Sequence, residues 1–298
     1  MRLHLGCGWE RWFPIDLRAT SRATAGMAKH HEIRMGTCGW DHDAWVGSFY
    51  PGGTTEEGYL AAYAQHFDLV EADSTFERVP TEELVDHWRI ATPRRFQFTL
   101  RAPRFITHEK VLEGCRDDFR AFVEVAGGLE KKLNCILLQF DYFAKQAFPQ
   151  ARLFYDRLDK FLAAAGGHVP VAVEIRNRTW LGPEWFDLLR RHKVISVLSD
   201  HPWMPSIAEM LERYDPFTGP AVYLRLTGER ETPNTPGGRD ARSGRGPAVS
   251  LPEVAAAVQQ ISTKSNVIVI ASDQFAGSAP DTITQLSALI GLHTSIEQ

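Results

Sequence analysis

The regular alternation of short apolar runs with longer amphipathic runs is the feature that most constrains this chain. From Ile33 onward the sequence holds eight short apolar runs, each followed by a stretch with helical periodicity. Strands that alternate with helices pair in parallel, because each helix returns the chain to the same end of the sheet. Eight such units predict a (β/α)8 TIM barrel, a fold of about 250 residues. The rival fold, an open doubly wound sheet, rarely needs eight consecutive units.

The chemistry of several helix starts agrees with this reading. Thr81 precedes Glu82 and Glu83, and Pro183 and Pro252 stand where a first helical turn tolerates proline. The expected strands span residues 33–37, 69–72, 96–100, 135–139, 171–175, 194–198, 221–226 and 267–271, and the expected helices span residues 56–66, 81–91, 115–126, 152–165, 183–192, 205–214, 252–263 and 281–290.

The pattern predicts one domain, a barrel over residues 33–298, preceded by a poorly ordered N-terminal extension over residues 1–32. The extension contains a Leu-Gly-Cys-Gly motif, but no acidic residue or βαβ continuation of the kind that a cofactor site needs follows it. Residues 227–249 are rich in Gly, Pro and Arg and are too long for an ordinary connection. We expect a lid or a disordered segment there, with residues 229–246 poorly ordered without ligand.

Charge and cysteine content narrow the class of protein. Lys and Arg number 33 against 37 Asp and Glu, so the net charge of −4 gives no overall basic field for nucleic acid or an anionic membrane. The 4 cysteines show no paired spacing, which argues against a disulfide framework and a zinc site. No apolar run approaches the roughly 18 residues of a membrane span. We therefore expect a cytoplasmic protein, and the pattern leaves its oligomeric state open.

Polar residues gather where the expected strands end. A spacing of two residues, as in Glu71 with Asp73 or Glu174 with Arg176, places both side chains on one face of a strand. An unpaired charge beneath the outer helices costs several kcal/mol, so the inward face at the open end of the barrel is favoured. The candidate residues are Glu71, Asp73, Arg101, Gln139, Glu174, Arg176 and Arg225 at strand ends, with Trp40, Arg104, His108, Asp200, His201 and Asp273 in the segments that follow strands.

Two interpretations of this cluster remain open. It is either a ring of buried ion pairs that holds the barrel end together, or an anion or sugar site with acid and base groups. The C-terminal face is where active sites of such barrels lie, so the cluster as a whole favours a functional site.

Several of these residues stand within motifs that resemble the YecE-like family, also called domain of unknown function 72, whose members have a TIM-barrel fold. The resemblance covers about residues 33–289 and implies the barrel and the position of the site, without supplying a reaction. The motifs are GTCGW (36–40) with Trp45, Gly47 and FYP (49–51), EADSTF (71–76), RAPRFITH (101–108), LLQF (137–140), VEIRNRTW (173–180), YLRLTG (223–228) and DQFAGSAP (273–280).

This chain departs from the family pattern at several positions of those motifs. The substitutions largely keep size and polarity, which implies a shared site whose chemistry has shifted or been lost. The departures are Asp73 for Asn, Glu77 for Tyr, Arg101 for Lys, Asn177 for His, Thr227 for His, and Ser272 with Asp273 for a pair of Asn.

The first functional hypothesis is an enzyme, of a hydrolase or isomerase type, acting on a phosphorylated or otherwise anionic small molecule or nucleotide. Guanidinium groups match phosphate oxygens, so the arginines would grip the anion. Glu71 or Glu174 would act as acid or base, and His108 as a second proton carrier. The substrate-binding set is Trp40, Asp73, Arg101, Arg104, Gln139, Arg176, Arg225 and Asp273.

Three alternatives stay open beside it. A metal-assisted reaction would use the oxygens of Glu71, Asp73, Glu174 and Asp273, although their spacing is not diagnostic and the metal stays unknown. A glycoside hydrolase would use Glu71 and Glu174 as its carboxylate pair. A noncatalytic protein would bind a ligand or nucleic acid, the latter through residues 225–245, which lack interleaved aromatics.

Overall fold

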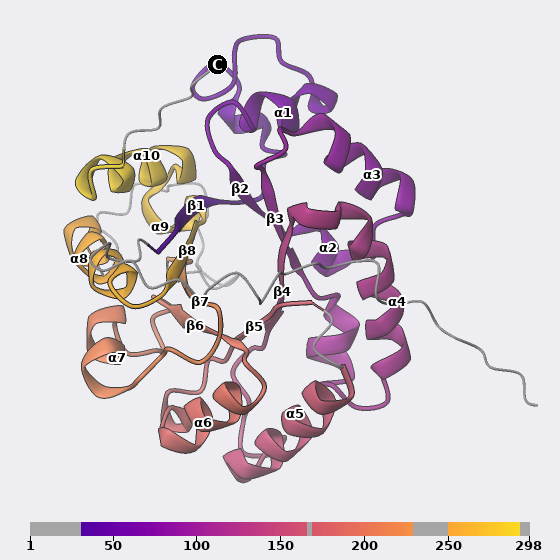
Figure 1. Ribbon diagram of the computed structural model, residues 1–298, viewed down its shortest axis with the longest axis vertical. Coiled ribbons are helices and arrows are strands. Elements are labelled where there is room, and N and C mark those ends of the chain that lie inside the picture. Colours follow the sequence, from indigo (N-terminus) through magenta and orange to yellow (C-terminus); the bar gives the residue numbers. More distant parts are fainter. Residues whose placement is uncertain (1–30, 166–168, 229–249, 293–298) are drawn as a thin grey trace, which may run out of the picture. The chain divides into compact units, whose positions relative to one another are not determined.

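The computed structural model describes residues 31–165, 169–228 and 250–292. Within them, eight parallel strands close into a barrel in chain order, and the last strand pairs with the first. Figure 1 shows the helices surrounding these strands. The prediction of a (β/α)8 TIM barrel is confirmed. Most of the expected N-terminal extension (residues 1–30) and the expected lid (residues 229–249) lie outside the described residues.

The elements follow the expected order, with boundaries that mostly shift by one or two residues. None of the helices in the described ranges is long and apolar enough to cross a membrane. The strands are β1 (Ile33–Cys38), β2 (Leu69–Ala72), β3 (Gln97–Arg101), β4 (Leu133–Gln139), β5 (Val171–Glu174), β6 (Ile195–Ser199), β7 (Ala221–Leu226) and β8 (Asn266–Ala271). The long helices are α1 (Glu56–Tyr63), α3 (Glu82–Ala91), α4 (Arg116–Ala126), α5 (Ala151–Ala165), α6 (Pro183–Arg191), α7 (Ile207–Arg213), α8 (Leu251–Ser262) and α10 (Ala279–Leu289).

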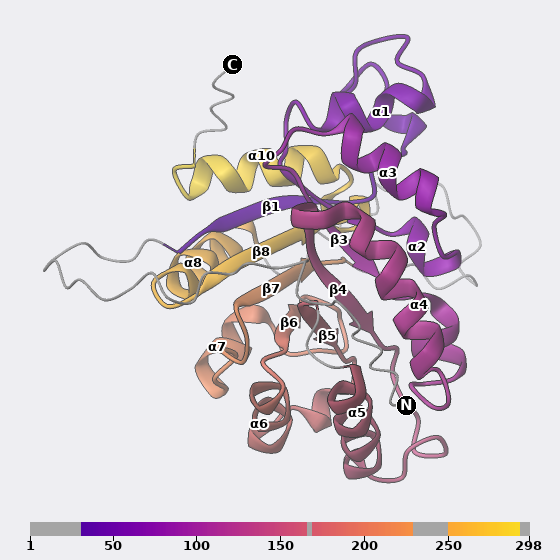
Figure 2. The same ribbon diagram turned by 45° about the vertical axis from the view of Figure 1, so that its right-hand side comes forward.

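Alternate side chains along each strand separate two layers of the core. Inward side chains, including Leu69, Leu137 and Tyr223, form one apolar cluster inside the barrel. A second and larger cluster fills the space between the strands and the helices. Figure 2 shows these helices on the outside of the barrel. Because side chains alternate, Glu71 follows Leu69 and Arg225 follows Tyr223 on the inward face. The barrel interior is therefore apolar below and charged at the carboxyl ends of the strands.

The GTCGW motif is explained by close packing between β1 and β2. A Cβ atom at Gly36 would lie 1.9 Å from the carbonyl oxygen of Leu69, so no other residue fits this strand position. The Tyr63 hydroxyl donates to that same carbonyl at 2.9 Å and accepts from the Thr37 backbone N–H at 2.9 Å. Gly39 then takes a left-handed turn with φ of 79°, the conformation that glycine adopts without strain. The motif thus builds the start of the barrel.

Short helical turns at the carboxyl ends of strands were not predicted from the sequence. They include α2 (Ser74–Glu77) after β2, a π-helical turn (Phe105–Glu109) after β3 and α9 (Asp273–Ala276) after β8. Turns of four or five residues are too short to show a helical period in sequence. They matter for the site because Asp73, His108 and Asp273 lie in or beside them.

Candidate functional site

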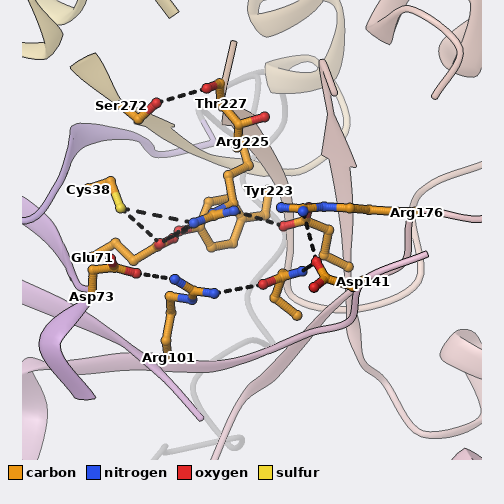
Figure 3. Close-up of polar contacts among 12 residues, drawn as sticks. Cys38, Glu71, Asp73, Arg101, Asp141, Arg176, Tyr223, Arg225, Thr227 and Ser272 are labelled. Carbon is orange, nitrogen blue, oxygen red and sulfur yellow. Dashed lines mark hydrogen bonds and ion pairs between the residues drawn. The ribbon is translucent and has the colours of Figure 1, made fainter. Parts of the chain in front are cut away.

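A buried arginine joins two glutamates at the barrel mouth. Figure 3 shows this arginine, Arg225, with the first of them, Glu71. Arg225 on β7 bonds Glu71 on β2 through Nη2 at 2.7 Å and through Nε at 3.1 and 3.2 Å. Its Nη1 donates to Glu174 on β5 at 3.2 Å. Both glutamates are 0% exposed and Arg225 is 5% exposed. This inner cluster, defined as Glu71, Arg225 and Glu174, ties three strands together across the barrel.

Neighbouring groups complete the inner cluster and set its protonation. The Tyr223 hydroxyl donates to Glu71 Oε2 at 2.5 Å, and the Cys38 thiol donates to Glu71 Oε1 at 3.4 Å. Burial raises the pKa of Glu71 and Glu174, but the charge of Arg225, together with neighbouring arginines and hydrogen bonds, outweighs burial and leaves both pKa values below normal. Burial and the Glu71 charge raise the pKa of Cys38 and of Tyr223. The two glutamates are therefore anions, and the thiol and the phenol keep their protons.

Arg101 at the end of β3 is held differently. Its Nη2 donates to Gln139 Oε1 at 2.6 Å, and its Nη1 pairs with Asp73. Its guanidinium lies 3.9 Å from the centre of the Phe76 ring. Arg101 is 4% exposed, whereas the Asp73 side chain is 46% exposed. One partner of this arginine is thus a neutral amide in the interior, and the other is a carboxylate in contact with water.

Arg176, which follows β5, also joins an interior partner to a carboxylate in contact with water, but its interior partner is charged. Its Nε donates to the buried Glu174 at 3.2 Å, and its Nη1 donates to Asp141 at 2.9 Å. The Asp141 side chain is 55% exposed. We call Asp73–Arg101 and Asp141–Arg176 the rim pairs, because each joins a buried guanidinium to a half-exposed carboxylate.

His108 lies beside the second rim pair, in the π-helical turn. Its Nε2 is 3.3 Å from Asp141 Oδ2, and its Nδ1 is 2.8 Å from the Thr107 hydroxyl. The hydrogen bond from His108 lowers the pKa of Asp141, burial raises it, and the Arg176 charge lowers it again, so the net pKa lies far below normal. Asp141 therefore stays ionised, and both ring nitrogens of His108 are in hydrogen-bond contact with protein groups, which fixes the orientation of the imidazole.

Two buried polar atoms near this mouth have no hydrogen-bond partner among the described residues. They are Nε of Arg101 and Oγ of Ser199, the last residue of β6. Ser199 pairs in register with Arg225, and it is 2% exposed. A buried polar atom without a partner costs roughly 1–3 kcal/mol, so such atoms in a native protein need an explanation.

Other residues expected at the site lie apart from this network. Asp273 accepts hydrogen bonds from the Trp45 indole at 3.1 Å and the Ala279 backbone at 2.7 Å, which fixes the start of α10. Trp40 packs edge-on against Trp88 at 5.3 Å, in the layer between strands and helices. Arg104 is exposed, in contrast to the buried arginines.

Asp200 and His201, in the segment after β6, are also placed by local contacts. Asp200 accepts from the Thr227 backbone N–H at 2.7 Å, and the net effect of burial and these hydrogen bonds raises its pKa. His201 is buried, and its Nδ1 accepts from the Trp203 backbone N–H at 3.3 Å. Asp200 thus holds Thr227 and Gly228, the two residues that follow β7.

One group of side chains in the described residues has the composition of a metal site. Ligand atoms of Cys38, Glu71 and Asp73 lie within 4.8 Å of one another. Glu71 is already bonded by Arg225, and Asp73 is already bonded by Arg101. An ion here would have to displace two guanidinium groups, so these contacts do not favour a metal.

Asp141, Tyr223, Ser199 and Cys38 belong to the mouth but were not among the residues selected from sequence. Asp141 follows Gln139 by two residues, and Tyr223 precedes Arg225 by two, so the spacing rule could have found both. Ser199 and Cys38 end their strands without a charge to mark them. Only the position at a strand end could have selected them.

A closed parallel barrel with its polar side chains gathered at the carboxyl ends of the strands defines a TIM-barrel protein with a candidate site on its C-terminal face. The chain belongs to the family described as "Protein of unknown function DUF72", whose model matches residues 34–297.

Two UPF0759 proteins are similar in sequence to this chain. The chain is 30% identical to the UPF0759 protein YunF of Bacillus subtilis over 211 residues, 67% of this chain and 68% of that protein. It is 30% identical to the UPF0759 protein YecE of Escherichia coli over 146 residues, 49% of this chain and 48% of that protein.

Crystal structures of family proteins share the fold. A DUF72 protein from Enterococcus faecalis matches with a TM-score of 0.68 at 23% identity, covering 89% of this chain and 99% of that one. A DUF72 protein from Thermotoga maritima matches with a TM-score of 0.67 at 22% identity, covering 88% of this chain and 100% of that one.

Proposed function

We propose that the protein is an enzyme that acts on a phosphorylated or otherwise anionic small molecule at the C-terminal mouth of the barrel. The observation that carries this proposal is the state of Arg101. Its guanidinium is buried, its Nε has no partner among the described residues, and its Nη1 is held by the half-exposed Asp73. An incoming anion would replace a solvated carboxylate and occupy an unused donor.

Guanidinium chemistry supports an anion at this position. Arg presents several N–H donors in a rigid fork that matches phosphate or carboxylate oxygens. Arg225 has no such freedom, because Glu71 and Glu174 occupy its three nitrogens on both sides. Arg176 has a half-exposed partner, as Arg101 has. The arginines of the rim pairs thus form the anion site, and the inner cluster forms the buried base of that site.

His108 is the proton carrier in this proposal. Asp141 holds Nε2 of the ring, and the His108 side chain is 16% exposed. The substrate would take the place of the Thr107 hydroxyl at Nδ1, and the proton would pass through that nitrogen. Glu71 and Glu174 are weaker bases than ordinary carboxylates, since the pKa of each is lowered. Their role is therefore to position the arginines. The reaction class is a proton-assisted hydrolysis or isomerisation.

The glycoside hydrolase alternative fits the inner cluster less well. That reaction needs one carboxylic acid with a raised pKa to protonate the leaving group. Arg225 lies between Glu71 and Glu174 and keeps both ionised. The nucleic-acid alternative depends on residues 225–245, of which residues 229–245 lie outside the described residues.

The test is thermal unfolding in the presence of a panel of sugar phosphates, nucleotides and inorganic phosphate. A ligand that binds the native state raises the melting temperature. The wild type and the control Arg34→Gln should respond to the same phosphorylated compound, and Arg101→Gln should not. Arg34 is the matched control, because it is a partly buried, ion-paired arginine at the amino end of β1, the opposite end of the barrel.

Turnover separates an enzyme from a binding protein. The responding compound is incubated with wild type and with His108→Gln, and products are followed by mass spectrometry. The proposal expects turnover by the wild type, and retained binding with turnover reduced about 100-fold or more in the variant. Binding without turnover by the wild type would assign a noncatalytic role, and equal melting shifts in the wild type and Arg101→Gln would overturn the anion site.

A further inference from the structure

Two large aromatic side chains stand exposed at the mouth of the barrel. Tyr142 follows β4 and is 54% exposed, and Trp203 follows β6 and is 58% exposed. Their rings contact each other edge to face, with centres 5.8 Å apart. Both segments come after the carboxyl ends of strands, the face on which the charged site lies.

The exposure of this aromatic pair contrasts with other tryptophans of the described residues. Trp45, Trp88 and Trp185 are each at most 4% exposed and pack in the core. Tryptophan carries a large apolar surface that folding ordinarily buries. Trp203 and Tyr142 are thus held in contact with each other while more than half of each residue stays in water. Neighbouring exposed aromatics on a rim are typical of a ligand-stacking surface.

Short connections place the aromatic pair beside the charged site. Tyr142 directly follows Asp141, which bonds Arg176 at 2.9 Å and lies 3.3 Å from His108. On the other side, the Trp203 backbone N–H donates to the buried His201, whose ring centre lies 5.0 Å from that of Trp203. The buried His201 therefore holds one end of the aromatic pair, and the chain connection to Asp141 of the second rim pair holds the other.

We propose that Tyr142 and Trp203 bind the base of a nucleotide whose phosphate is bound by the arginines of the rim pairs. The inference rests on the proposed function and narrows its substrate class. A nucleotide has a flat apolar base at one end and an anion at the other, joined by a sugar. The mouth offers an aromatic surface and buried guanidinium groups as separate neighbouring subsites, which matches that division. Every base has a π-face, so the aromatic pair can stack on any base. Differences in affinity between bases would come from the strength of stacking.

The experiment is isothermal titration calorimetry with adenosine, ribose 5-phosphate and the four ribonucleoside 5′-monophosphates. The wild type should bind at least one nucleotide about tenfold more tightly than ribose 5-phosphate, because base stacking on an aromatic side chain adds affinity. Trp203→Ala and Tyr142→Ala should lower nucleotide affinity about tenfold and leave the affinity for ribose 5-phosphate unchanged. Ile90→Ala is the control, since Ile90 is 69% exposed near the end of α3 and lies apart from these loops.

The outcomes separate the two proposals. Equal affinities for ribose 5-phosphate and all four nucleotides would overturn the stacking surface and leave the anion site standing. Tighter nucleotide binding that both alanine variants retain would also overturn it. No binding of any phosphorylated probe would overturn both proposals. If adenosine binds as tightly as its monophosphate, the phosphate subsite is wrong and so is the nucleotide assignment.

Discussion

The inner cluster and the rim pairs use the same chemistry in opposite ways. Glu71, Arg225 and Glu174 are almost wholly buried, and each carboxylate is bonded by a guanidinium. In the rim pairs the guanidinium is buried, but the carboxylates Asp73 and Asp141 are about half exposed. A buried charge that loses its partner is costly, whereas an exposed carboxylate is resolvated by water. We infer that the exposure of the carboxylate distinguishes ion pairs that hold the fold from ion pairs that open to a ligand.

Removal of a carboxylate from the inner cluster should have the largest effect. Glu71→Ala leaves Arg225 buried and only partly neutralised by Glu174, so the free energy of unfolding should fall by about 3–5 kcal/mol. Urea denaturation followed by circular dichroism measures the loss. Glu71→Leu with Arg225→Met should lose less than the sum of the single changes, since it leaves no orphaned cation. Losses that simply add would show that the two residues do not act as a pair.

Acid should remove the contribution of the inner cluster. The pKa of Glu71 is lowered from 4.5, so its folded form binds its proton less readily than the unfolded chain does. Its stabilisation is present above pH 4.5 and is lost as pH falls through the lower folded pKa. The difference in unfolding free energy between wild type and Glu71→Gln should stay constant from about pH 8 to about pH 5 and shrink below that. A difference that shrinks near neutral pH would contradict the assignment.

Two serines of β6 test whether the mouth carries unused polar groups. Ser196 is buried and its hydroxyl donates to the Pro216 carbonyl at 2.5 Å, whereas the Ser199 hydroxyl has no partner among the described residues. Ser196→Ala should cost about 1 kcal/mol of unfolding free energy, and Ser199→Ala should cost nothing or stabilise. Thermal unfolding of the matched pair gives the comparison. Equal losses would mean that Ser199 is bonded in the free protein.

Opening a rim pair should have a smaller effect on the fold than opening the inner cluster. Asp73→Asn removes a half-exposed carboxylate, but the buried Arg101 keeps its hydrogen bond to Gln139 and stays in the field of the charged Glu71 and Glu174, so we expect a smaller loss of unfolding free energy than in Glu71→Ala. The same change removes a negative charge that competes for Arg101, so affinity for a phosphorylated ligand should rise about fivefold. Denaturation and calorimetry measure the two effects. A loss comparable to that of Glu71→Ala would erase the distinction between rim and interior.

The sequence predicted the barrel well because its signal is local and repeated eight times. Each strand was expected within two residues of its observed bounds, since apolar runs and helix starts depend on neighbouring residues. The pairing of charges depends on contacts across the barrel, such as Arg225 with Glu71, which are 154 positions apart. Spacing placed Glu71, Arg101, Glu174 and Arg225 at one end but did not reveal their partners.

The remaining differences have the same origin. Asp273 was expected at the site because it follows β8, but the short helix α9 turns its carboxylate to Trp45 and the start of α10. Asp141 was not selected, although it joins His108 to Arg176. Both outcomes depend on the paths of loops, for which the sequence carries no period.

The most direct test of the account is a crystal structure of the protein with ribose 5-phosphate bound. The account predicts a phosphate oxygen on Nε of Arg101, with Asp73 displaced from Nη1. It also predicts that Arg225 still joins Glu71 and Glu174. A phosphate bound elsewhere, or Asp73 still paired with Arg101, or an inner cluster opened by the ligand, would contradict it.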